Sequence, residues 1–140
     1  MFLGKISSKD WMVTVGTLPV IGLAEGSNIQ IAMNNDQISV STGIGGDWTF
    51  VENPDVSAGL TFTTQRNSPS NTVLAQMQQN GSVFPVSLTN TRNLTRHTIG
   101  YGMFSRRPTD GANNGAGAQS LEWTILTGEV DSTIIGAIVF

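Results

Sequence analysis

Apolar and polar residues alternate with a period of two along most of this chain, which is the pattern of half-buried β-strands. The clearest stripe is Val56, Ala58, Leu60 and Phe62, with small or hydroxyl-bearing residues between its members. Shorter stripes recur at residues 11–15, 29–33, 38–40, 48–50, 83–88, 99–103, 121–125 and 132–140. We therefore predict a mainly β protein of eight or nine short strands, folded as a sandwich or barrel.

One stretch breaks the alternation and predicts a single short helix over about residues 69–80. Ser68 is placed to be its N-cap, and Pro69 suits the first helical position, where no N–H is required. Gly81 follows Asn80 as a C′ residue. The apolar stripe consists of Val73, Leu74 and Met77. The segment has no ionisable side chain, so we interpret this helix as a packing element that flanks a sheet.

The stripes on either side of residue 40 predict a long β-hairpin over about residues 28–52. The glycine-rich segment "STGIGGD", Ser41 to Asp47, forms its tip. Ile44 is an apolar residue at that tip, and two interpretations remain open for it. In the first, Ile44 folds back onto its own sheet; in the second, it inserts into another subunit. A second segment, Arg106 to Ser120, is rich in glycine and alanine and predicts an exposed connection.

Length and composition favour one domain spanning residues 1–140. The start has no basic-then-apolar leader, and the apolar run that ends the sequence is too short to cross a bilayer. We therefore expect a protein that is made and used in a cytoplasm and is not inserted in a membrane. The chain has no cysteine, which excludes disulfides, thiolate nucleophiles and thiolate metal sites.

Charge is sparse, at 12% of residues, and it is segregated along the chain. Residues 1–55 hold six acids and two lysines, residues 56–109 hold five arginines without an acid, and residues 110–140 hold four acids without a base. One interpretation is that folding interleaves these blocks into a mixed surface. The other is that the basic face of one copy meets the acidic face of the next, a heterologous contact that generates rings or filaments.

The sequence contains few residues or motifs that indicate catalysis. His97 is the single histidine, so a multi-histidine metal site is excluded, and we interpret it as a hydrogen-bonded strand residue rather than a general base. The sequence has no G-x-S-x-G motif, P-loop or EF-hand loop. A pI near 4.8 opposes a phosphate-seeking surface. We expect no enzyme activity, no cofactor and no metal; an assembly role remains.

Four motifs in order resemble the tail tube proteins of contractile-tailed bacteriophages. They are "GLAEG" before the hairpin, "GLTFTTQRNSPSNTVLAQM" leading into the helix, "FPV" after it, and "LEWTILTGEV" near the end. The resemblance spans about residues 11–130. The hairpin tip departs from the family pattern, because it reads Ile44-Gly45-Gly46-Asp47 in place of a simple Asp-Gly.

The resemblance implies a tube subunit without catalysis. Six copies would close a ring with a continuous β-barrel lumen, and rings would stack into the inner tube of a virion tail, assembled in the bacterial host cytoplasm. The implied partners are other copies, a surrounding sheath, a baseplate or initiator, and a tail terminator, while DNA passes through the lumen without specific binding.

Two groups of residues are assigned from this resemblance together with the charge pattern. The expected subunit or ring contacts are Ile44, Gly45, Gly46, Asp47, Arg66, Arg106 and Arg107. The expected lumen-facing acids are Asp36, Asp47, Glu52 and Asp55. The alternatives are a tube subunit of a phage-derived injection or secretion machine, and a monomeric β-sandwich module that binds a glycan or protein through residues 106–120.

Overall fold

The computed structural model describes residues 1–23, 29–111 and 120–136. Within them the chain forms a short 3₁₀ turn at Ser8–Asp10, one α-helix and ten strands. The first strands are β1 (Trp11–Val15), β2 (Leu18–Pro19), β3 (Gln30–Met33), β4 (Ile38–Thr42), β5 (Trp48–Glu52) and β6 (Ala58–Gln65). Helix α1 (Ser70–Gln79) is followed by β7 (Phe84–Asn90), β8 (Arg96–Phe104), β9 (Ser120–Thr127) and β10 (Asp131–Thr133). The prediction of a mainly β fold with one flanking helix is confirmed.

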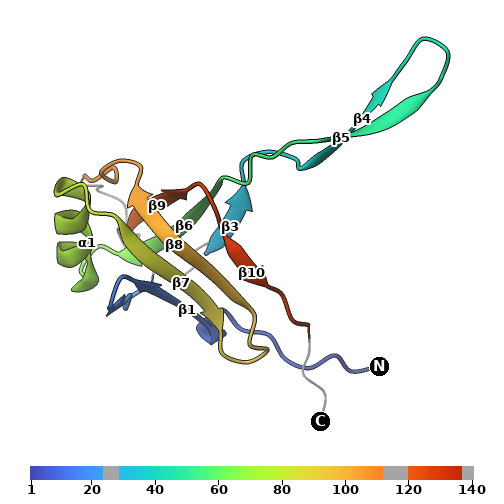
Figure 1. Cartoon of the computed structure of the whole chain (residues 1–140). Coiled ribbons are helices and arrows are strands. Elements are labelled where there is room, and N and C mark those ends of the chain that lie inside the picture. Colours follow the sequence, from blue (N-terminus) through green and yellow to red (C-terminus); the bar gives the residue numbers. More distant parts are fainter. Residues whose placement is uncertain (24–28, 112–119, 137–140) are drawn as a thin grey trace.

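Eight of these strands form one antiparallel sheet, the body of the molecule (Figure 1). Its order is β2-β1-β7-β8-β9-β6-β3, and β10 pairs with β8 beside that path. The longest pairing joins β6 to β9 over eight residue pairs, from Ala58↔Thr127 to Gln65↔Ser120. Both strands alternate strictly between buried and outward positions, so their inner faces are the apolar stripes of the sequence.

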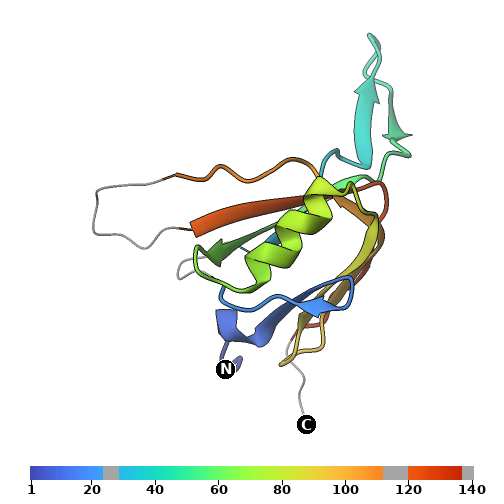
Figure 2. The ribbon, with the colours of Figure 1, turned by 90° about the vertical axis from the view of Figure 1, so that its left-hand side faces the viewer.

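The sheet curls, and the segment after β2 connects its two ends. Val20 donates its N–H to the carbonyl of Val13 on β1 at 2.9 Å, and Gln65 on β6 donates to the carbonyl of Gly22 at 2.7 Å. Leu23 adds an isolated bridge to Thr64. Helix α1 lies against this closure (Figure 2). A barrel-like body results, because both ends of the sheet are tied to the same short segment.

The core lies inside this curl and is built from the predicted stripes. Its largest fully buried apolar side chains are those of Trp123, Phe62, Leu60, Leu74, Ile99 and Ile125. Phe104 stacks at a tilt on both Phe84 and Trp123, with ring centroids 5.1 and 5.2 Å apart. Tilted aromatic pairs of this kind add to the stabilisation that comes from burial alone.

Helix α1 is held by polar as well as apolar contacts. Leu74 is fully buried, whereas Val73 of the predicted stripe is 39% exposed. Asn71 is buried and donates to the carbonyls of Gln65 and Arg66 at 2.9 and 3.0 Å. Its side-chain oxygen accepts from the Thr64 hydroxyl, which in turn accepts from the Trp123 indole N–H at 3.2 Å. The helix is therefore anchored through its first turn.

The helix caps follow the sequence with one shift. Pro69 precedes the first helical residue instead of being it, and it makes no side-chain cap. Ser68 still accepts the N–H of Ser70 at 3.3 Å. At the other end Gly81 has a φ of +63°, its N–H reaches the carbonyl of Gln78, and the N–H of Ser82 reaches the carbonyl of Met77. These two bonds form a Schellman motif, as the Asn80-Gly81 pair predicts.

The predicted long hairpin divides into two parts. Its outer part, β4 with β5, is a two-stranded sheet that projects away from the body (Figure 1). Its inner part, β3, pairs with β6 in register from Gln30↔Thr61 to Met33↔Ala58. Strand β5 ends at Glu52, as the predicted boundary has it, but the partner of β3 is β6 and not β5. We call residues 29–57 the ribbon. Residues 34–37 and 53–57 form a neck without strand pairing, and beyond the neck β3 pairs with β6 in the main sheet.

Strand β8 contains an irregularity that the alternation did not predict. The pairing with β7 shifts register between Val86↔Ile99 and Phe84↔Gly102. Ile99 is consequently buried, while Tyr101 is 81% exposed. A Cβ on Gly102 would lie 2.9 Å from the Ile125 side chain of the neighbouring strand β9, so glycine at this position leaves room for that side chain. The sequence interpretation had placed Ile99, Tyr101 and Met103 in one stripe.

Candidate functional site

The β4–β5 hairpin carries an apolar face with no cover among the residues that the structure describes. All ten of its strand residues are exposed. Cross-strand pairs Val40↔Phe50 and Thr42↔Trp48 place the large side chains on one side, with Ile38↔Glu52 at the base. Ile38, Val40, Trp48 and Phe50 are 56–64% exposed, and we call this set the hairpin face. The rings of Trp48 and Phe50 contact each other edge-to-face, with their centroids 5.0 Å apart.

The tip of the hairpin is a tight turn, as the glycines predict. Gly43 donates its N–H to the carbonyl of Asp47 at 2.7 Å, and Gly46 donates to Gly43 at 3.1 Å. Gly46 has a φ of +84°, which favours glycine at that position. Ile44 is fully exposed, so the interpretation in which it folds back onto its own sheet is wrong. Insertion of Ile44 into another subunit stays a prediction, as do the contacts expected of Gly45, Gly46 and Asp47.

A polar neck joins the hairpin to the body. The N–H of Ser57 donates to one carboxylate oxygen of Asp55 at 2.9 Å, and Asn35 donates to the other at 2.7 Å. Asn34 donates to the Ser57 hydroxyl at 2.9 Å. The pKa of Asp55 is lowered below its ordinary value, mainly because the Ser57 N–H stabilises the charged form. The neck thus fixes how the hairpin leaves the body.

The four predicted lumen acids all belong to this ribbon. Asp36 and Asp55 lie at the neck, Asp47 lies at the tip, and Glu52 ends β5 beside Ile38. All four are exposed, and residues 29–57 contain no lysine or arginine. The ribbon is therefore uniformly negative. Nothing in a single copy shows which surface faces a lumen, so the lumen assignment stays a prediction.

Two of the five arginines pair with acids of the flanking blocks inside the chain. Arg66 binds Asp110 through two bonds of 2.9 and 3.0 Å. Arg92 binds Asp10 at 2.7 Å and thereby lowers the pKa of that carboxyl. For these residues the interleaved interpretation of the charge blocks is confirmed. Arg106 and Arg107 lie on the exposed segment that follows β8, and their predicted contacts with another copy remain untested.

A shallow apolar groove runs over the outer side of the body near the hairpin neck. Its volume is about 650 Å³, and Asn34 and Ser57 of the neck are among the residues that line it. Its apolar lining comes from Val83, Tyr101, Met103, Phe104 and Leu126. We call it the body groove; it exists because the irregularity in β8 turns Tyr101 and Met103 outward.

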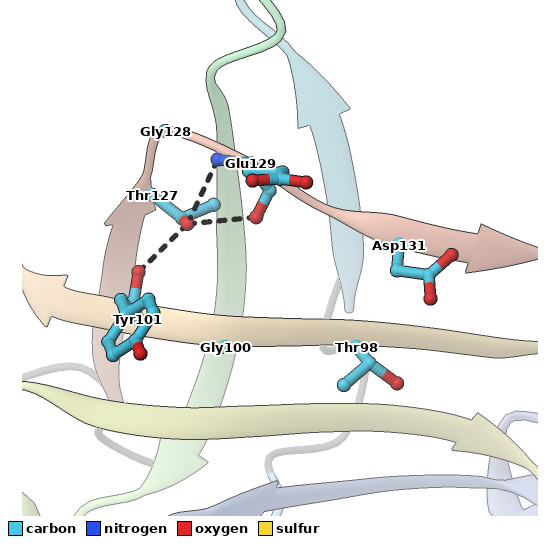
Figure 3. Close-up of a pocket in the computed structure, with 7 residues that line it drawn as sticks. All are labelled: Thr98, Gly100, Tyr101, Thr127, Gly128, Glu129 and Asp131. Atoms are coloured by element: carbon cyan, nitrogen blue, oxygen red, sulfur yellow. Dashed lines mark hydrogen bonds between the residues drawn. The ribbon is translucent and has the colours of Figure 1, made fainter.

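A second hollow, of about 540 Å³, lies where the sheet divides between β9 and β10 (Figure 3). Strand β9 pairs with β8 only from Gly102 onward, and β10 pairs with it only up to Thr98. The Thr127 hydroxyl lies 2.9 Å from the carbonyl of Tyr101 and 3.0 Å from that of Glu129, and it accepts the Glu129 N–H at 3.3 Å. This threonine satisfies backbone groups at the division. The hollow is open, and its carboxylates, Glu129 and Asp131, lie on exposed backbone.

His97 is a hydrogen-bonded strand residue, as predicted. It lies on β8 opposite Ser132 of β10, and its Nδ1 is 2.7 Å from the Ser132 hydroxyl. Partial burial lowers its pKa. Among the described residues no three His, Asp or Glu side chains gather to hold a metal, and no helix is long and apolar enough to cross a membrane. The binding loop proposed at residues 106–120 falls largely on residues 112–119, outside those described.

Comparison with known proteins identifies the fold. No protein-family model matches the chain, and no curated protein sequence matches it. Solved structures do. A chain of the sheath/tube terminator of an extracellular contractile injection system, PVC, in its extended state superposes with a TM-score of 0.66 at 11% identity, covering 94% of this chain and 98% of that one. A chain of the virion of a native gene transfer agent particle gives 0.66 at 17% identity, covering 93% and 100%.

A chain of the sheath-tube complex of the same type of injection system gives a TM-score of 0.63 at 12% identity, covering 94% of this chain and 93% of that one. These matches extend over nearly the whole of each chain. The chain described here therefore has the fold of proteins from contractile injection systems and phage-like particles, and the resemblance read from the sequence is supported at the level of fold.

Proposed function

We propose that this protein is a structural subunit of the inner tube of a contractile phage tail, or of the tube of a phage-derived injection machine. Copies would form hexameric rings that stack into a hollow tube, which conducts DNA or another cargo. One observation carries this proposal. A chain with the fold found in tube-associated structures projects a hairpin whose apolar face has no cover among the described residues.

The hairpin face supports assembly on energetic grounds. A two-stranded hairpin is marginally stable in water without further strands or a packed partner. Four large side chains that are each more than half exposed on such a hairpin form an apolar patch of the kind that marks interaction sites. Covering the face with another copy both stabilises the hairpin and adds roughly 25 cal/mol for each Å² of apolar surface removed from water.

The edges of the body sheet support ring closure. Among the described residues, the strand pairings of β3 are with β6 alone and those of β10 are with β8 alone, so residues 31–33 and 131–133 each border an edge that no further strand covers. Free edges are aggregation hazards for a monomer and are removed when a barrel closes. Joining such edges between neighbouring copies would build the continuous lumen that the sequence resemblance implies. The number of six copies rests on that resemblance.

The charge of the ribbon supports a conduit for nucleic acid. Asp36, Asp47, Glu52 and Asp55 give it a negative field with no compensating base over residues 29–57. A negative surface repels phosphates and keeps a passing polyanion from binding. A sheath outside, a baseplate or initiator at one end and a terminator at the other are the partners that this role requires, with the assembled particle as its location.

Electron microscopy of the purified protein tests the proposal. We expect hollow rods or rings in negative stain, and a sedimentation coefficient that rises with protein concentration. Both follow from a heterologous contact that adds copies at an open end. A chain that stays near 15 kDa, alone and with its initiating baseplate complex, would contradict the tube role and favour the monomeric binding module.

A tube terminator is a second candidate, because a terminator structure is among those that match over most of both chains. A terminator closes a tube and does not extend it. Titration of the protein into growing tubes separates the two roles. A tube subunit lengthens them in proportion to the amount added, whereas a terminator stops their growth at one copy of its ring per tube.

A further inference from the structure

The chain has a second exposed apolar segment besides the hairpin face. Residues 1–7, which we call the arm, precede the 3₁₀ turn and contain Phe2, Leu3 and Ile6. These side chains are 88%, 74% and 92% exposed. Scattered single apolar residues are ordinary on a surface, but three within five positions form a patch. The arm therefore needs a partner for the same reason as the hairpin face does.

The arm and the hairpin lie at opposite ends of the molecule. Figure 1 shows the hairpin above the body and the start of the chain below it, both extending toward the right of that view. Figure 2, turned about the vertical axis, keeps the same separation. The body separates the two segments along the vertical axis of both views. In a head-to-tail stack along that axis, the arm of one copy approaches the hairpin of the next.

The two segments are complementary in charge. Lys5 lies between Leu3 and Ile6 on the arm. Glu52 shares the hairpin face with Phe50 and is paired across the strands with Ile38. The hairpin ribbon holds four acids and no base, and the arm holds a base and no acid. Each segment thus presents apolar side chains beside one opposite charge, which favours pairing between unlike ends and opposes pairing between like ends.

The arm is also long enough to span the hairpin face. Seven extended residues span roughly 23 Å. A strand of five residues, such as β5, spans about 17 Å, so the arm is long enough to cover the whole face. Gly4 has a φ of +89°, which breaks a regular strand. Contact through side chains on the face is therefore favoured over addition of the arm as a third strand.

We propose that the arm of one copy docks on the hairpin face of the next copy, with Lys5 beside Glu52. This contact rests on the proposed stacking function and specifies which segments make it. It assigns Glu52 to the joint between copies and leaves Asp36, Asp47 and Asp55 as the candidate lumen acids. Because it is heterologous, it leaves a free arm at one end of a stack and a free hairpin face at the other. It adds a joint between successive rings that is separate from the edge pairing within a ring.

A charge exchange tests the orientation. Lys5→Glu and Glu52→Lys should each raise the critical concentration for polymerisation roughly two- to fivefold, as expected for an exposed ion pair. The double variant K5E/E52K should return to within twofold of the wild type, because the pair is restored with reversed signs. Lys5 also attracts the Asp10 carboxylate of its own chain electrostatically, and the double variant separates the two effects, since it leaves that attraction abolished. Lys9→Glu is the matched control and should change little.

Cross-linking tests the contact directly, because the chain has no cysteine of its own. Leu3→Cys combined with Val40→Cys should give, on oxidation of assembled protein, a ladder of multimers that reduction abolishes. Leu3→Cys with Val51→Cys is the control, since Val51 lies on the opposite face of the same strand pair. Circular dichroism of each variant verifies that the body is folded.

The outcomes separate this inference from the tube role. If wild-type rods form but the Leu3–Val40 pair gives no ladder, the docking is wrong and the tube role stands. A ladder from Val40→Cys with Leu126→Cys instead would assign the hairpin face to the body groove of the neighbour and would equally overturn the docking. Wild-type protein that forms neither rods nor ladders contradicts both proposals. Failure of the K5E/E52K double variant to recover polymerisation overturns the proposed ion pair.

Discussion

Strand pairs β6–β9 and β4–β5 have the same alternating pattern but very different surroundings. In β6, Ala58, Leu60 and Phe62 are fully buried, whereas in β5, Trp48 and Phe50 are more than half exposed. In the body, the other strands of the curled sheet and helix α1 cover the inner face. The hairpin face has no such layer among the described residues. Alternation thus specifies that a strand has an apolar face, and the rest of the chain or another copy must cover it.

The largest difference between the two regions should appear in stability. Phe62→Ala removes a fully buried ring from the core and should lower the free energy of unfolding by about 3–5 kcal/mol. Phe50→Ala, the same change on the hairpin face, should alter it by less than about 0.5 kcal/mol in the monomer. Urea unfolding of both variants at a concentration below polymerisation measures this. A large loss in Phe50→Ala would mean that the hairpin face is covered within its own chain.

Polymerisation, in contrast to monomer stability, should depend strongly on the hairpin face. Phe50→Ser should raise the critical concentration for polymerisation roughly 10- to 100-fold, the equivalent of losing one buried aromatic side chain at each contact. Val51→Ser is the matched control, because Val51 is the next residue of the same strand and points to the other face. Light scattering against concentration gives both values. Equal effects of the two changes would show that the hairpin acts through its backbone or its stiffness, not through its apolar face.

Those features of the body that depend on residues adjacent in the sequence could be predicted. The stripes at residues 58–62 and 121–125 and the Asn80-Gly81 helix stop depend on neighbouring residues, and the structure follows them. The partner of β3 could not be predicted, because nothing in its own residues distinguishes β6 from β5. The close approach at Gly102 was missed for a similar reason, since it depends on Ile125 of another strand.

The candidate site was predicted in part. The projecting hairpin, its glycine tip and its acids are all visible in the sequence. The polar contacts that fix them are not. The lumen role of Asp55 stays a prediction, and the sequence does not show that both of its carboxylate oxygens are bound in the neck. Arg66 and Asp110 are separated by 44 residues, and the ion pair between them depends on how β6 and the segment after β8 meet in space.

Acid should loosen the hairpin before it affects the body. The folded-state pKa of Asp55 is depressed below 3.8, so the stability it gives to the neck is complete above that pH and is lost as the pH falls through the folded value. Heteronuclear NOE values for β4 and β5 should therefore fall below about pH 3.8 while those of β6 and β9 hold. Asp55→Asn removes this titration, so its hairpin should lose less order than the wild-type hairpin as the pH falls through this range. Parallel loss in both strand pairs would assign the acid transition to the body instead.

The smallest effect concerns Arg66, which lies on the body but was assigned to an interface. Its ion pair with Asp110 has side chains 46% and 48% exposed, so Arg66→Ala and Asp110→Ala should each change the free energy of unfolding by less than about 1 kcal/mol. Polymerisation distinguishes the two roles of the arginine. If Arg66 serves only its own chain, both variants shift the critical concentration equally and slightly. If it also contacts an acid of the next copy, Arg66→Ala weakens assembly, while Asp110→Ala frees the guanidinium for the neighbour and strengthens it. Opposite shifts of the critical concentration in Arg66→Ala and Asp110→Ala would thus show that the interface extends from the hairpin to the body.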